Sequence, residues 1–129
     1  PGALALLQSL HGSLQIGIAT ANLLGAAELR LKDAGLWHHV SARAHGADDG
    51  GHKRQILARA MAATGLPKNR IVYIGDNLND VEAGLSNGVH FIGFSTDSSR
   101  LAELERAGAS HTSNNHLDSF RLIGHLLQR

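Results

Sequence analysis

Short apolar runs in this chain alternate with segments that have the periodicity of amphipathic helices. The runs LQIGIAT at 14–20, IVYIG at 71–75 and VHFIGFST at 89–96 are each followed by a helical pattern. Strands that are joined through helices usually pair in parallel, with right-handed crossover connections. The alternation therefore predicts an α/β fold with a mainly parallel sheet.

The remaining elements follow from the same periodicities and from glycine and serine at segment ends. Helices are expected at 1–10, 21–35, 53–63, 80–88, 98–108 and 116–129, a short strand and a loop within 37–47, a loop at 64–70, and an edge strand at 110–114.

Length and composition limit the possible classes of protein. The 129 residues predict a single domain over 1–129. The formal net charge of +1 gives no electrostatic case for nucleic acid or a membrane surface as partner. The chain has no cysteine, which favours the reducing cytoplasm and excludes disulfides and thiolate metal sites. No segment resembles a secretory signal or a membrane span.

Polar residues follow two of the expected strands where they end. Thr20 closes the strand at 14–20 and is followed by Asn22, while Asp76 follows the strand at 71–75. Ligands of open parallel sheets bind beyond the carboxyl ends of the strands. We therefore expect these residues to lie along one edge of the sheet.

Asp76 and Asp80 have two interpretations. Two carboxylates at a strand end would suit Mg²⁺, which prefers oxygen ligands and keeps several waters. Alternatively, Asp80 caps the following helix and Asp76 makes a turn. The residues alone leave both interpretations open.

Lys53 and Arg54 open the helix that precedes this strand. Cations are disfavoured at a helix start, so either residue is a candidate to contact a phosphate or to neutralise the acids. The alternative is a solvated pair of charges on a helix start.

Histidines are also frequent, nine in all, and four of them are His38, His39, His45 and His52. Imidazole is a common zinc ligand, but their spacing matches no compact ligand set, so we interpret them as scattered surface residues. No phosphate-binding glycine loop or nucleophile elbow is present.

Taken in order, these segments resemble the haloacid dehalogenase-like superfamily of hydrolases, and most closely its phosphoglycolate-phosphatase-like members. The resemblance is carried by IGIATAN at 16–22, by Lys53, by GLPKNRIVYIGDNLNDVEAGLSNG at 65–88 and by GFST at 93–96. It covers nearly the whole chain, and the GDNLND segment is its most specific part.

The resemblance implies a Rossmann-like three-layer sandwich and Mg²⁺-dependent hydrolysis of a small phosphomonoester. By this analogy Thr20 and Asn22 bind the phosphoryl group, and Lys53, or Arg54 one residue later, offsets negative charge. Asp76 holds Mg²⁺, directly or through water, and Asp80 supports it. Thr20 and Lys53 are therefore the expected catalytic residues, although the proline that usually follows the lysine is absent.

The sequence departs from the family at the nucleophile. The family uses an aspartate in a D-x-D-x-T stretch on the first strand, and this sequence contains no such stretch. We therefore expect the chain to be the C-terminal part of a longer phosphatase, lacking the nucleophile strand and the cap domain. The part alone is expected to be inactive, because positioning groups cannot replace a carboxylate nucleophile.

Loss of that strand would leave exposed inner strand edges, so we expect that the two flanking strands pair directly, or that a second copy or a missing N-terminal segment completes the sheet. Two other classes remain as alternatives. The chain could be a non-catalytic binding or assembly module with the same fold, which the missing nucleophile favours. A receiver or nucleotide-binding domain would need an early acidic cluster, which this sequence lacks.

Overall fold

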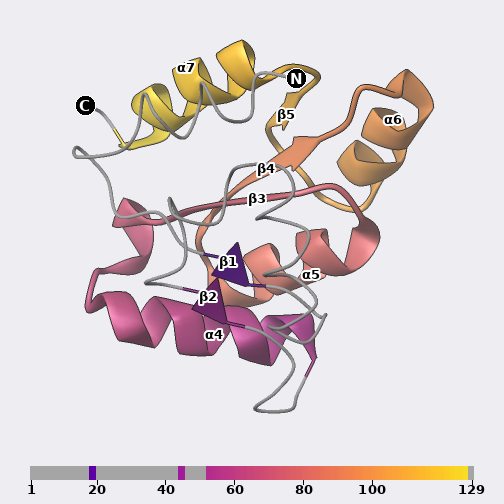
Figure 1. Cartoon of the computed structure of the whole chain (residues 1–129). Helices are drawn as coiled ribbons and strands as arrows, with labels where there is room; N and C mark the ends of the chain where they lie inside the picture. The colour runs from indigo at the N-terminus through magenta and orange to yellow at the C-terminus, as the bar shows by residue number, and fades with distance from the viewer. Residues whose placement is uncertain (1–17, 20–43, 46–51, 128–129) are drawn as a thin grey trace. The chain divides into compact units, whose positions relative to one another are not determined.

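The computed structural model describes residues 18–19, 44–45 and 52–127 (Figure 1). The chain divides into two compact units, with the boundary between Gly65 and Leu66. Thr20, Asn22 and the helices expected at 1–10 and 21–35 lie outside the described residues. The prediction of a single domain stays a prediction.

The first unit contains two short strands and one helix. Strands β1 (Ile18–Ala19) and β2 (Ala44–His45) pair in parallel, and helix α4 (Lys53–Thr64) packs against both. Both strands fall within segments where the sequence predicted them. The start of α4 is fixed by the backbone N–H of His52, which donates to Gln55 Oε1 over 2.8 Å. Helix α4 ends at Gly65, whose φ of 68° is in the left-handed region that favours glycine.

The second unit is built around a parallel sheet. It contains the 3₁₀ turn η3 (Lys68–Arg70) and strands β3 (Val72–Gly75), β4 (His90–Phe94) and β5 (Thr112–Ser113), in the sheet order β3-β4-β5. The strands alternate with helices α5 (Leu78–Asn87), α6 (Ser98–Arg106) and α7 (His116–Leu127). The predicted α/β class with a parallel sheet is confirmed.

Helices cover both faces of this sheet (Figure 1). On one face α5 and α6 pack against each other and against β4, and α7 lies across the sheet from α5. The core below α5 and α6 is aliphatic and aromatic, with Tyr73 and Leu101 at its margin; its buried members are Val81, Phe91, Leu104 and Ala109. On the other face, Ser119, Ile123 and Leu127 are buried along one side of α7, four residues apart as helical periodicity requires.

The start of helix α5 and the segment before β3 differ from the sequence prediction. Helix α5 begins at Leu78 rather than at Asp80, because Asn77 is its N-terminal cap and accepts from the backbone N–H of Asp80 over 3.4 Å. The segment expected to be a plain loop at 64–70 contains η3. Among the described helices, none is long and apolar enough to cross a membrane.

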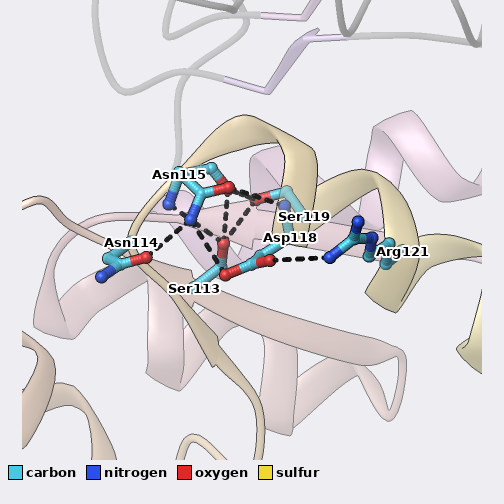
Figure 2. Close-up of polar contacts among 6 residues, drawn as sticks. All are labelled: Ser113, Asn114, Asn115, Asp118, Ser119 and Arg121. Carbon is cyan, nitrogen blue, oxygen red and sulfur yellow. Dashed lines mark hydrogen bonds and ion pairs between the residues drawn. The ribbon is translucent and has the colours of Figure 1, made fainter.

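A polar network fixes the start of α7 (Figure 2). Asn115 Oδ1 accepts from the backbone N–H of Asp118 over 2.8 Å, and Asn115 Nδ2 donates to Asp118 Oδ2 over 2.9 Å. Beneath this cap, the buried hydroxyl of Ser119 donates to Ser113 Oγ over 3.0 Å, and Ser113 Oγ donates to the Asn115 carbonyl over 2.7 Å. These bonds tie the end of β5 to the first turn of α7.

A substitution at Leu104 tests how much the buried core contributes to the stability of the second unit. The Leu104 side chain is 0% exposed and is part of the buried cluster. Leu104→Ala is expected to lower the free energy of unfolding by about 2–5 kcal/mol, because it leaves a cavity that the neighbours fill only in part. Leu117→Ala is the matched control, since Leu117 is 59% exposed and its loss is expected to change stability by about 0.5 kcal/mol or less. Urea unfolding of both variants measures the difference, and equal losses would contradict this core assignment.

Candidate metal and phosphate site

The candidate site lies at the carboxyl end of β3. The strand ends at Gly75, Asp76 follows with an exposed side chain, and Asn77 caps α5. The Asp76 carboxylate accepts a long hydrogen bond of 3.4 Å, from Asn77 Nδ2 to its Oδ1. Asp76 therefore presents a carboxylate to solvent at the edge of a parallel sheet, as the sequence predicted.

Asp80 occupies a different environment. Asp80 is only 3% exposed, so its charged side chain is buried in the second unit. Oδ2 accepts from the backbone N–H groups of Asp76, over 3.1 Å, and of Asn77, over 3.3 Å. Asp80 thus completes a reciprocal capping box with Asn77 at the start of α5. Asp80 is thus the reciprocal partner of the cap residue Asn77 rather than the cap itself, while its metal-supporting role stays a prediction.

Gly75 makes this arrangement possible through packing. A Cβ atom at position 75 would lie 2.2 Å from Asp80 Cβ and 2.6 Å from Asp80 Oδ2. These distances are shorter than any real contact between such atoms. Only glycine therefore allows the Asp80 side chain to lie against the end of β3 and to reach the loop.

Tyr73 is a member of the site that the sequence analysis did not identify. Its hydroxyl donates to Asp80 Oδ1 over 2.7 Å. Burial raises the pKa of Tyr73 well above its ordinary value, and the hydrogen bond to Asp80 raises it further, so the phenol remains a donor at neutral pH. Strand alternation places Tyr73 and Gly75 on one face of β3, and this was the signal available in the sequence.

The neighbouring strands end in groups that cap helices. Asp97, after β4, accepts from the backbone N–H of Ser99 over 3.0 Å and from its hydroxyl over 2.8 Å. These hydrogen bonds lower the pKa of Asp97. Asn115 caps α7 after β5 in the same way. Asp97 and Asn115 thus have structural partners, whereas Asp76 turns its carboxylate to solvent.

The other predicted site residues belong to the first unit or lie outside the described residues. Lys53 is the first residue of α4 and is half-buried, and Arg54 beside it is exposed. Their approach to Asp76, like the roles expected of Thr20 and Asn22, stays a prediction. The structure brings together Asp76 and Asp80, which lie in the same loop and helix start.

The ligand requirements of Mg²⁺ limit which of the described residues could hold it. Within 18–19, 44–45 and 52–127, no group of three or more His, Cys, Asp or Glu side chains is placed to hold a metal ion. Mg²⁺ is usually bound by one or two carboxylates, with waters and substrate phosphate oxygens completing six ligands. An exposed carboxylate on a fixed loop fits that requirement, and Asp76 is the residue of the described part that would supply it.

Comparison with known proteins agrees with this fold. Residues 1–94 match the family model of haloacid dehalogenase-like hydrolases, and the chain belongs to this family. No curated protein matches the chain.

Solved structures show the same fold. A hydrolase from Pseudomonas syringae is 26% identical, with a TM-score of 0.80 over 97% of this chain. A Clostridium acetobutylicum protein described as a "predicted phosphatase" is 25% identical, with a TM-score of 0.85 over 95% of the chain. A haloacid dehalogenase-like hydrolase from Streptococcus pneumoniae is 19% identical, with a TM-score of 0.84 over 95% of the chain. The chain spans 58% of the length of each of these proteins.

Substitution of Gly75 tests the geometry of the site. Gly75→Ala is expected to displace the Asp80 side chain and to lower the free energy of unfolding by about 1–3 kcal/mol, because the new methyl group overlaps a buried carboxylate. Gly124→Ala, in α7, is the matched control because a Cβ there meets nothing within 4 Å. It is expected to leave stability unchanged or to raise it by up to about 1 kcal/mol. Chemical unfolding distinguishes the two, and a neutral Gly75→Ala variant would contradict the close packing.

Proposed function

We propose that the protein carrying this chain is a Mg²⁺-dependent phosphatase that hydrolyses a small phosphomonoester. The observation that carries the proposal is the exposed carboxylate of Asp76 at the carboxyl edge of the sheet, in a chain of the haloacid dehalogenase-like hydrolase family. Sheet edges of this kind are where ligands of parallel α/β folds bind.

Each predicted residue has a role in this proposal. Asp76 holds Mg²⁺, and Asp80 supports Asp76 by fixing the loop that carries it. Thr20 and Asn22 donate hydrogen bonds to the phosphoryl oxygens, and Lys53, or Arg54, neutralises negative charge near them. Bound Mg²⁺ supplies the remaining positive charge that phosphoryl transfer requires.

The proposed reaction is a double displacement at phosphorus. A carboxylate oxygen, from an aspartate that these 129 residues do not supply, attacks phosphorus while the bond to the alcohol oxygen breaks. The alcohol leaves with a proton, and water then cleaves the aspartyl phosphate to release inorganic phosphate. Positioning and charge stabilisation, which are the roles given to the residues of this chain, account for most catalysis of this type.

A non-catalytic binding or assembly module is the second candidate function. The absence of a D-x-D-x-T stretch from the sequence favours it.

The phosphatase proposal also includes a cytoplasmic location, supported by the lack of cysteine, and a further segment or second copy that completes the sheet. Neither nucleic acid nor membrane is a proposed partner, given the small net charge.

Asp76→Asn tests the function directly. In the intact protein that carries this chain, the substitution is expected to reduce Mg²⁺-dependent hydrolysis of p-nitrophenyl phosphate by roughly 100-fold or more, because a neutral amide binds Mg²⁺ poorly. Glu103→Gln is the matched control: it also removes one negative charge, but from the exposed side of α6, and is expected to retain full activity.

The outcomes separate the two candidate functions. A wild-type protein with turnover that Asp76→Asn abolishes supports the phosphatase. Turnover that survives in Asp76→Asn removes Asp76 as the metal ligand. A folded intact protein without turnover on any phosphomonoester tested favours the binding module.

A further inference from the structure

We propose that Tyr73 is a positioning residue of this site, which holds the loop of Asp76 through the carboxylate of Asp80. The inference rests on the proposed function for the role of Asp76, and it adds a residue outside the GDNLND segment. It also gives the two acids different roles: Asp76 faces the ligand, and Asp80 faces the protein.

The first step is the placement of Tyr73. Its ring packs beside Phe91 of the adjacent strand, with ring centroids 5.9 Å apart and planes tilted by 48°. The two residues are register partners in the β3–β4 pair, so the ring is held by the sheet itself. From this position the hydroxyl donates to Asp80 Oδ1 over 2.7 Å, a shorter hydrogen bond than those that Asp80 Oδ2 accepts from the backbone of Asp76 and Asn77.

The second step connects Asp80 to the loop. Oδ2 of the same carboxylate accepts from the backbone N–H groups of Asp76 and Asn77, over 3.1 and 3.3 Å. One oxygen of the Asp80 carboxylate therefore holds the backbone of Asp76, the proposed metal ligand. Tyr73 holds the other oxygen of the same carboxylate. A carboxylate that loses a donor can rotate more freely. The backbone N–H groups that donate to it are then held less tightly.

The hydroxyl of Tyr73, rather than its ring, carries the positioning role. Phenylalanine at position 73 would keep the contact with Phe91 and the fit against the core, since it differs only by the hydroxyl. It would leave Asp80, which is 3% exposed, without that donor. Buried polar groups are strongly disfavoured without partners, so Asp80 would shift to find another donor and would move the loop with it.

Tyr73→Phe in the intact protein is the test, with two measurements. The Mg²⁺ concentration for half-maximal phosphatase activity is expected to rise about tenfold, the effect typical of losing a partner behind a metal ligand. In the metal-free protein, hydrogen exchange of the Asp76 and Asn77 amides is expected to become faster. Incorporation of 4-aminophenylalanine at position 73, which restores an N–H donor at the same place, is expected to reverse both changes at least in part.

Ser119→Ala is the matched control. It removes another buried hydroxyl of the second unit, which donates to Ser113 Oγ over 3.0 Å and to the Asn115 carbonyl over 3.2 Å at the start of α7. It is expected to lower the melting temperature without changing the Mg²⁺ requirement or the exchange of the Asp76 and Asn77 amides. A purely structural role for Tyr73 would make the two variants behave alike.

Each possible result either supports or overturns the positioning role of Tyr73. If Tyr73→Phe leaves both the Mg²⁺ requirement and the two amides at wild-type values, the proposal is overturned. The proposal is likewise overturned if the 4-aminophenylalanine variant behaves like Tyr73→Phe, or if Ser119→Ala gives the same changes. If the intact protein shows no turnover but the two amides exchange faster in Tyr73→Phe alone, the positioning role stands and the phosphatase function fails.

Discussion

The buried carboxylate of Asp80 sets the path of the chain from β3 into α5. Burial of a charged group is unfavourable unless hydrogen bonds replace its lost water, and here donors come from Tyr73 and from the backbone of Asp76 and Asn77. Each such bond to a charged group contributes about 1.5–3 kcal/mol. Gly75 belongs to the same arrangement, because any side chain there would occupy the space of the carboxylate.

This arrangement explains how the end of a strand presents an exposed carboxylate on a fixed backbone. The parallel sheet of the second unit places the ends of its three strands at one edge, and a helix begins shortly after each of them. Asn77, Asp97 and Asn115 use their side chains to satisfy the free N–H groups of those helices. Asp76 lies one residue before Asn77, which caps α5, so Asp76 does not itself cap the helix. Its carboxylate therefore remains exposed on a backbone that Asp80 fixes. A ligand-binding group on a fixed loop loses little freedom when it binds.

Much of this could be predicted from the sequence, and the exceptions have physical reasons. The apolar run before Gly75 and the helical pattern before Gly88 predicted β3 and α5, because periodicity and glycine stops are local properties. The start of α5 was placed two residues late because Asp80 looked like a cap, whereas Asn77 is the cap and Asp80 its reciprocal partner. Tyr73 was missed because alternation shows which face a side chain is on, but not that a carboxylate of the next helix lies within 2.7 Å of it.

The sequence by itself determined the family, the α/β class, the parallel pairing and the position of Asp76 at a strand end, since all of these follow from the order of elements and a specific motif. Only the tertiary structure decided that Asp80 faces inward and Asp76 outward. The sequence placed one at a strand end and the other near a helix start, but neither residue type nor spacing showed which carboxylate is buried. The packing of α5 against β3 does, because it buries one carboxylate against Gly75 and Tyr73 and leaves the other in water.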